Sequence, residues 1–204
     1  KPGDLILIAA GPDDAVFASL GYLRCRIADS LDLADKNAWH FLWIVDFPLM
    51  EKDAETGSMK AKHHPFTAPN PADIDRMDDA PDQVRALAYD IVLNGTEIGG
   101  GSIRIHDPSL QSKMFAALGL PQDEIAGKFG FLIDAFRYGV PPHGGLAYGL
   151  DRLVMLLLGE CSIRETMAFP KNQSAEDPVS AAPGPASAEQ LSELGLRLCE
   201  HDGV

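Results

Sequence analysis

The sequence predicts an α+β fold in which an antiparallel sheet is flanked by helices and preceded by the tail of a small α/β module. The clearest sign is Asn94-Gly95, a dipeptide typical of two-residue hairpin turns, which lies between two segments of strand character. Apolar residues recur at helical spacing over residues 109–118 and 122–136. A glycine-rich strand over residues 144–149 is expected to lead directly into an apolar helix over residues 150–158.

The beginning of the chain has the pattern of a small α/β module. Residues 5–10 predict a short strand, and residues 13–33 predict a helix because Leu20 and Leu23 belong to an apolar series at helical spacing. The chain begins with Lys1, and strand-like residues follow at once. We therefore expect it to be cut from a longer chain.

The larger domain is expected to begin after residue 38. A polar stretch, residues 34–37, precedes an apolar strand candidate at residues 41–45. We therefore divide the chain into residues 1–38 and residues 39–204. In the second part, residues 51–82 are rich in Pro, Asp and Ala and show weak periodicity, which predicts a long excursion over the surface.

Composition narrows the class of protein. With 204 residues, 46% of them hydrophobic, the chain can bury one sizeable core beside a smaller appendage. The net charge of -13 argues against its being the main docking surface for a nucleic-acid backbone. No apolar run approaches the roughly 20 residues of a membrane span. Cys25, Cys161 and Cys199 lack metal-ligand spacing, which favours reduced thiols in a cytosolic protein.

Two carboxylates flank the predicted hairpin turn. If Asn94-Gly95 forms the turn, Leu93 faces Thr96 and Val92 faces Glu97, so Asp90 is a diagonal neighbour of Glu97 on the same face. Such a pair can share Mg²⁺, which takes one or two protein carboxylates and completes its shell with waters and phosphates. The alternative is two solvated acids on an exposed face, and spacing by itself favours that alternative.

The segment after Glu97 carries three consecutive glycines at residues 99–101 and then Arg104. Glycines in a strand indicate close approach by a ligand or by another backbone. Arg104 is suited to bind a carboxylate with two parallel hydrogen bonds. Simple alternation places Arg104 on the face opposite Glu97, and a bulge in the glycine run would bring it round. An exposed surface arginine is an equal alternative.

Two further groups could contact a ligand. Gly149 leaves room for a flat ligand, and Arg152 at the start of a helix would favour phosphate, although close strand packing beside a surface arginine is at least as good an explanation. The adjacent His63 and His64 point apart in an extended chain, so a shared metal is not expected, but either could bond a substrate carboxylate. A polar loop is the alternative. His143 is interpreted as a turn residue.

Together these segments resemble class II aminoacyl-tRNA synthetases, and bacterial-type aspartyl-tRNA synthetase in particular. Residues 145–152 are similar to the third signature motif of the class, and residues 89–104 to the segment that precedes it in the aspartate, asparagine and lysine subgroup. Phe47-Pro48 followed by residues 63–67 is similar to the bacterial aspartate enzymes rather than to the lysine or asparagine enzymes. Residues 163–171 also resemble the family's ending.

The resemblance implies roles for individual residues. Asp90 and Glu97 would hold Mg²⁺, and Arg104 and Arg152 would be catalytic. The aspartate-binding residues would be His63, His64 and Arg104. The ATP-binding residues would be Glu97, Gly149, Leu150, Asp151 and Arg152.

The activity implied is ligation of aspartate to tRNA through aspartyl-adenylate, with ATP as substrate, in a cytoplasmic homodimer. The fold implied is the C-terminal half of the catalytic core, after the end of a bacterial insertion domain. The family's first two motifs and its anticodon-binding barrel are not in this sequence, so the fragment alone is expected to be inactive. Whether asparagine tRNA is also a substrate stays open.

Two other functions stay open beside this one. A non-catalytic paralogue or separately expressed fragment could bind adenosine, an amino acid or another protein, and the presence of Asp90, Glu97, Arg104 and Arg152 weighs against it. An ammonia-dependent asparagine synthetase on the same core is disfavoured by the His63 segment.

Overall fold

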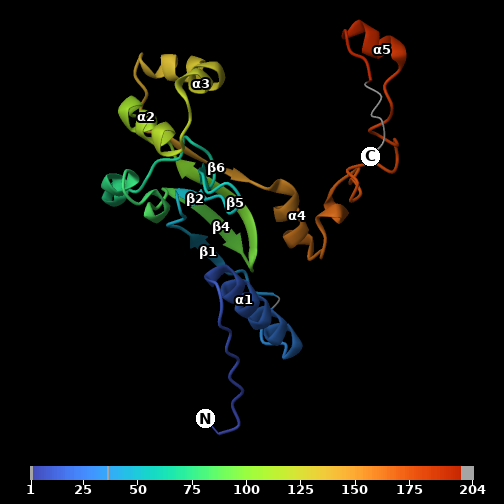
Figure 1. Cartoon of the computed structure of the whole chain (residues 1–204). Coiled ribbons are helices and arrows are strands. Elements are labelled where there is room, and N and C mark those ends of the chain that lie inside the picture. The colour runs from blue at the N-terminus through green and yellow to red at the C-terminus, as the bar shows by residue number, and fades with distance from the viewer. Residues whose placement is uncertain (1, 36, 199–204) are drawn as a thin grey trace. The chain divides into compact units, whose positions relative to one another are not determined.

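The computed structural model describes residues 2–35 and 37–198. Contacts within the chain divide it into two compact units, Lys1–Phe41 and Leu42–Val204. The first contains a single described helix, α1, and the second contains the sheets and the other helices (Figure 1). The assignment of the two units as an insertion-domain tail and a catalytic half stays a prediction.

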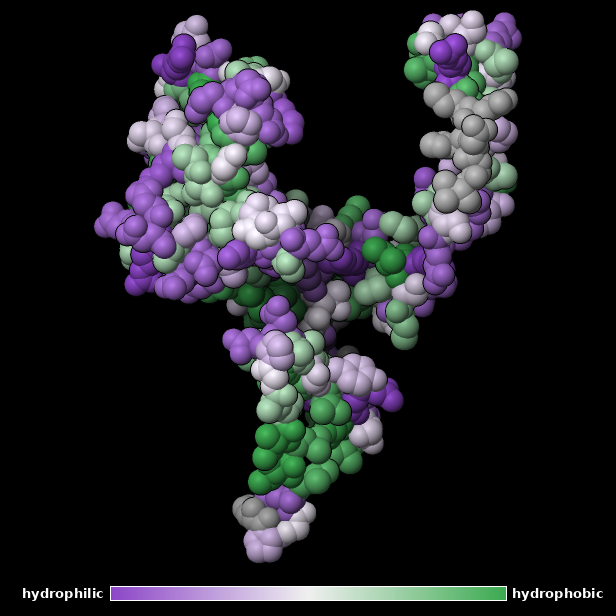
Figure 2. Space-filling view, in the orientation of Figure 1, coloured by the Kyte–Doolittle hydropathy of each residue, from purple (hydrophilic) through white to green (hydrophobic). Residues whose placement is uncertain are grey.

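The first unit confirms the predicted helix and not the predicted strand. α1 covers Asp13–Ser30. The carboxylates of Asp13 and Asp14 lie in its first turn, where their negative charge interacts favourably with the positive end of the helix dipole. Residues 5–10 have no regular structure, so the predicted strand is wrong. A strand needs a neighbour to bond its backbone, and the described part of this unit provides none. The segment is exposed and forms the hydrophobic patch near the N-terminus in Figure 2.

A four-stranded sheet organises the second unit, in the order β1-β4-β5-β6 (Figure 1). The strands are β1 (Phe41–Ile44), β4 (Ala88–Leu93), β5 (Thr96–Ile103) and β6 (Gly144–Tyr148). β5 is antiparallel to both β4 and β6. The expected class, antiparallel strands combined with helices, is confirmed.

The hairpin between β4 and β5 turns at Asn94 and Gly95, as predicted. Both residues have positive φ, 49° and 83°, which is the requirement of the tight turn that matches strand twist. Leu93 pairs with Thr96 and Val92 with Glu97. The turn therefore fixes the register from which the two predicted carboxylates take their positions.

The predicted helices are present with small differences at their ends. They are α2 (Pro108–Ala117), α3 (Gln122–Phe136) and α4 (Leu150–Leu158). A further helix, α5 (Ala188–Glu193), lies nearer the C-terminus. Asp107 caps α2 by accepting the backbone N–H groups of Ser109 and Leu110 at 2.7 and 3.0 Å. No helix among the described residues is long and apolar enough to cross a membrane.

Residues 51–82 are more ordered than the surface excursion that their composition predicts. They contribute to a β-hairpin, β2 (Met50–Lys52) with β3 (Met59–Ala61), and contain the 3₁₀ helices η1 (Pro71–Met77) and η2 (Pro81–Gln83). Isolated bridges join Thr67 to Arg104 and Pro69 to Ala86. Part of residues 51–82 therefore belongs to the core, because their backbone pairs with residues that flank strands of the sheet.

The main core lies where this segment, β4 and α2 meet. Its buried members are Leu49, Met50, Ala68, Met77, Val84, Ala86, Ala88, Ile105 and Met114. Asp73 is buried beside this cluster and is paired with Arg85, whose Nε lies 2.7 Å from Oδ2. Burial of a carboxylate requires such a partner. A smaller set of rings, Phe66, Phe115 and Phe129, packs between α2, α3 and the loop of residues 63–67.

Candidate functional site

A β-bulge in β5 decides which side chains share a face. Val92 pairs with Glu97, but Ile91 already pairs with Gly99, so Ile98 is the extra residue. Its carbonyl accepts the backbone N–H of Gly149 at 2.9 Å. The bulge shifts the alternation of the strand by one position between Glu97 and Gly99.

Beyond the bulge, Asp90 pairs with Gly100, so Asp90, Glu97 and Gly100 lie on one face. Alternation from Gly100 brings Arg104 to this same face. The simple alternation that placed Arg104 opposite Glu97 is therefore wrong, because a bulge interrupts it at Ile98, directly before the glycine run in which a bulge was considered. A single extra residue reverses the parity of all that follows it.

The two predicted carboxylates are close enough to influence each other. Partial burial raises the pKa of the Asp90 carboxyl, and the negative charge of Glu97 raises it further, whereas nearby His63 acts in the opposite direction. A methyl group at Gly100 would collide with the Asp90 carboxylate. Asp90 therefore lies across β5 in the space that Gly100 leaves.

The other two glycines of the run have a different role. A Cβ at Gly99 or Gly101 would collide with the carbonyl oxygens of Ala147 or Gly145 on β6. The predicted close approach to the glycine run is therefore confirmed. The backbone of β6 approaches Gly99 and Gly101, and the Asp90 side chain approaches Gly100.

Arg152 bridges the start of α4 and the hairpin. Its Nη1 donates to the Glu97 carbonyl at 2.9 Å and lies 3.4 Å from the Glu97 carboxylate. A Cβ at Gly149 would contact the Arg152 side chain at 3.6 Å, so the arginine stem passes over this glycine. Leu150 is exposed, and the carbonyl of Asp151 accepts the Thr166 hydroxyl at 3.3 Å. Gly149 caps α4 without a side chain, so the positive helix end stays accessible.

The second arginine meets the histidine loop, residues 63–67. Nη1 of Arg104 lies 3.1 Å from Nδ1 of His64 and also contacts Nε2. Partial burial, followed by the Arg104 charge, lowers the pKa of the His64 ring. A guanidinium only donates, so the ring nitrogen that meets it must accept, and His64 is neutral. His63 is exposed and packs edge-on against Phe47, with ring centroids 5.1 Å apart.

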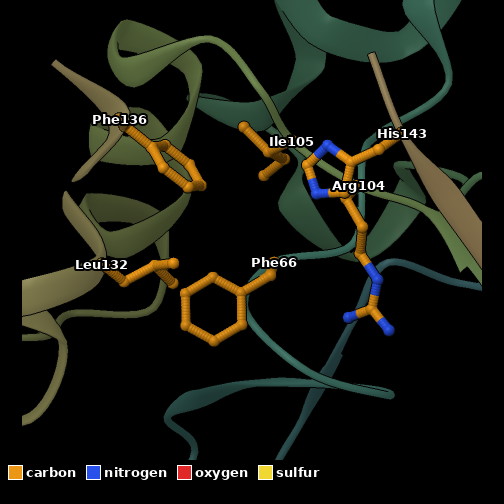
Figure 3. A pocket seen from close by; sticks show the side chains of 6 residues that line it. All are labelled: Phe66, Arg104, Ile105, Leu132, Phe136 and His143. Carbon is orange, nitrogen blue, oxygen red and sulfur yellow. The ribbon is translucent and has the colours of Figure 1, made fainter. Parts of the chain in front are cut away.

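A cavity of about 230 Å³ adjoins Arg104 (Figure 3). Its lining residues are Phe66, Arg104, Ile105, Leu132, Phe136 and His143. His143 was interpreted as a turn residue, yet its carbonyl accepts the Arg104 backbone N–H at 2.9 Å. The signal that could have found it is the β5–β6 register, which runs from Gly99–Tyr148 to Ile103–Gly144 and continues to this pair.

The described residues thus form two neighbouring clusters along β5. Asp90, Glu97 and Arg152 gather at the bulge, and His64 and Arg104 meet at the far end of the strand. His63 connects the two, since it directly precedes His64 in the loop and its charge acts on Asp90. The arrangement offers a carboxylate pair for a hard cation and two arginines for anions.

Comparison with known proteins gives the family. The family model of class II tRNA synthetases (D, K and N) matches residues 20–173. The chain belongs to this family. This match confirms the resemblance to class II tRNA synthetases, and the fold described above confirms the expected combination of helices and an antiparallel sheet.

Individual relatives are named as aspartate–tRNA ligases. The chain is 55% identical, over 96% of its length, to the aspartate–tRNA(Asp/Asn) ligase of Caldanaerobacter subterraneus, and 52% identical, over 99%, to the aspartate–tRNA ligase of Clostridium botulinum. An aspartyl-tRNA synthetase structure from Entamoeba histolytica matches 87% of this chain and 30% of its own, with 26% identity and a TM-score of 0.50. The chain spans about a third of the length of the two curated relatives, 33% and 34%.

Proposed function

We propose that this chain supplies part of the active site of an aspartate–tRNA ligase, which forms aspartyl-adenylate from L-aspartate and ATP and transfers the aspartyl group to tRNA. The observation that carries the proposal is the bulge at Ile98, because it brings Arg104 onto the face of Asp90 and Glu97. The identities to relatives named as aspartate–tRNA ligases support it.

The proposed reaction needs alignment and charge neutralisation rather than a protein nucleophile. The aspartate α-carboxylate attacks the α-phosphate of ATP, pyrophosphate leaves, and an acyl phosphate bond forms. Arg104 would hold an aspartate carboxylate and Arg152 an ATP phosphate, each with charge-assisted hydrogen bonds. Groups held in this way lower the barrier by orientation and electrostatic stabilisation.

Asp90 and Glu97 are the residues proposed to hold Mg²⁺. Their fit rests on the donor set, which is two carboxylates on one face; partial burial, followed by the charge of Glu97, raises the pKa of Asp90. The ion would neutralise phosphate charge when bound. Mg²⁺ needs only one or two protein carboxylates. Among the described residues no group of three or more His, Cys, Asp or Glu side chains is gathered for a metal.

The ion pair of Arg152 with Glu97 fits this proposal. Both side chains are about half exposed, at 46% and 53%, and pairs of this kind contribute at most about 1 kcal/mol. Little free energy would therefore be lost when the pair separates so that Arg152 binds phosphate and Glu97 binds Mg²⁺. The pair holds both side chains near their proposed positions before the substrate binds.

Selectivity for aspartate over asparagine would rest on Arg104. A guanidinium that faces an amide loses a charge-assisted bond and leaves donors unpaired, which disfavours the amide strongly. His63 and His64 complete the proposed aspartate site, His64 by accepting from Arg104. Gly149, Leu150 and Asp151 would border the ATP.

The larger context is proposed as well. The complete protein would act in the cytoplasm as a homodimer and would bind tRNA mainly through regions outside this chain, consistent with its net charge of -13. The two curated relatives differ in whether their names include asparagine tRNA, so both tRNAs are candidate acceptors.

The test is aspartate-dependent exchange of pyrophosphate into ATP by the complete protein. We expect exchange with aspartate and not with asparagine or lysine, and a loss of at least about 100-fold in Arg104→Ala and Arg152→Ala. Arg137→Ala is the matched control, because Arg137 is exposed and pairs with Asp134 on α3, away from β5. A complete protein inert with all three amino acids would refute the proposal and favour a non-catalytic paralogue.

A further inference from the structure

Gln111 on α2 is a polar side chain in the core for which the proposed reaction has no direct use. Its exposed fraction is 0%, and its Nε2 donates to the Pro65 carbonyl at 2.8 Å. Its Oε1 has no hydrogen-bond partner in the part of the chain that the structure describes. A buried amide that leaves one polar atom unpaired destabilises the folded state relative to an apolar side chain of the same shape.

Pro65 lies in the middle of the histidine loop, between His64 and Phe66. Proline has no N–H, so its carbonyl is the one backbone group of residue 65 that can form a hydrogen bond. Gln111 is the partner of that carbonyl. The bond therefore ties α2 to the peptide unit between Pro65 and Phe66, one residue beyond His64.

The rest of the loop is held on its C-terminal side. The Phe66 carbonyl accepts the Ile105 backbone N–H at 2.9 Å, and the Phe66 ring packs edge-on against Phe115 and Phe129. Thr67 pairs with Arg104. These contacts place residues 66 and 67. The Phe66 backbone N–H also donates to Nδ1 of His64 at 3.2 Å, and the Gln111 bond fixes Pro65, the residue between the two.

We propose that Gln111 is a positioning residue for aspartate recognition: its amide N–H groups fix the Pro65 carbonyl and so hold the His64 ring against the Arg104 guanidinium. His64 in turn accepts from Arg104 and limits the directions in which the guanidinium can point. This inference rests on the proposed function, because it concerns the arginine that would bind aspartate.

The first measurement needs no activity. In the complete protein, the His64 ring is titrated by NMR, and its signal is assigned by its loss in His64→Gln. Gln111→Met keeps the length of the side chain and removes the donor. We expect the His64 pKa to rise toward its ordinary value of 6.5 in this variant, because burial and the Arg104 charge that lower it would both weaken.

The second measurement uses pyrophosphate exchange in the complete protein. Gln111→Met should raise KM for aspartate about tenfold and leave KM for ATP unchanged, because the ATP-side groups lie at the other end of β5. The matched control is Gln122→Met, the same substitution at an exposed position on α3, and it should alter neither KM nor the His64 pKa.

Gln111→Glu serves as a second variant of matched size in case the methionine variant does not fold. Its ionised carboxylate cannot donate to the Pro65 carbonyl, so KM for aspartate should rise. Protonation at lower pH restores an O–H donor and should reverse the rise, an effect that a purely structural role would not produce.

A folded Gln111 variant with an unchanged His64 pKa and an unchanged KM for aspartate would overturn the inference. Failure of the proposed function gives a different result, since then the wild-type protein would show no aspartate-dependent exchange. The His64 titration would still decide whether Gln111 positions the loop.

Discussion

At the scale of single residues, the site depends on pairs in which one member sets the position or charge of the other. Gly100 makes room for Asp90. Beside the larger effect of partial burial, the charge of Glu97 raises the pKa of Asp90 and the charge of Arg104 lowers the pKa of His64. None of the partners is adjacent in sequence. The chemistry of each group therefore depends on the register of β4 and β5 and on the loop packed at their end.

Gly100→Ala tests the first of these pairs. The new methyl group would collide with the Asp90 carboxylate and turn it away from Glu97. We expect the Mg²⁺ concentration that supports half-maximal exchange in the complete protein to rise about tenfold, as for the loss of one charged ligand contact.

The control for this substitution is Gly145→Ala on neighbouring β6, where an added Cβ meets nothing within 4 Å. Equal Mg²⁺ dependence in Gly100→Ala and in wild type would show that Asp90 does not need the space above Gly100.

At the scale of secondary-structure elements, the β4–β5 hairpin and the segment that precedes it form the scaffold of the site. The tight turn at Asn94-Gly95 sets the register, and the bulge at Ile98 then reverses the parity of the remaining strand. On the other side, η1 is joined to the segment before β4 by Asp73, which accepts the Arg85 side-chain and backbone N–H groups. An ion pair between the buried Asp73 and the exposed Arg85 thus links the excursion of residues 51–82 to the sheet.

The link through Asp73 predicts a pH dependence of stability. Hydrogen bonds from the Arg85 side chain lower the pKa of Asp73 below its ordinary value of 3.8. The unfolded chain then binds more protons than the folded chain near pH 3–4, so this contribution is fully present above the unfolded pKa and is lost as pH falls through the folded pKa.

Asp73→Asn should therefore be less stable than wild type at pH 6, and the difference in free energy of unfolding should shrink below about pH 4. Urea unfolding followed by circular dichroism at several pH values measures it. Asp75→Asn, at an exposed position of η1, is the matched control. A difference that stays constant from pH 6 to pH 3 would mean that the Asp73 charge does not contribute.

At the scale of the whole molecule, the chain spans about a third of the curated relatives that it matches, 33% and 34% of their lengths. The residues proposed for Mg²⁺, for one ATP phosphate and for one aspartate carboxylate are all in it. The family resemblance implies that a further arginine, for the α-phosphate, is in the second motif, which this sequence does not contain.

We therefore expect the 204-residue chain alone to give no aspartate-dependent pyrophosphate exchange under conditions in which the complete protein is active. Stabilisation of the transferring phosphate by positioned cations is a large part of catalysis, and one missing donor costs on the order of 100-fold or more. The measurement is the exchange assay on both proteins at equal concentration. Exchange by the chain alone would place every essential group within these residues.

Local sequence was sufficient to predict most of the helices, the hairpin turn and the shared face of two candidate site residues. Asn94-Gly95 sets a hairpin turn because both positions tolerate positive φ, Asp107-Pro108 begins α2, and the apolar run of residues 150–158 forms α4. From the turn alone, Asp90 and Glu97 fall on one face. These features depend on neighbours a few residues apart, which local physical chemistry can specify.

Features that depend on contacts between distant residues could be seen only in the folded structure. Ile98 forms a bulge where Gly149 joins it, and that bulge moves Arg104 to the site face. Residues 5–10 have strand character but no neighbouring strand, and Gln111, a polar residue, is buried because the Pro65 carbonyl needs a donor. Pairing and burial are satisfied by groups far apart in the chain, so no local pattern could have settled them.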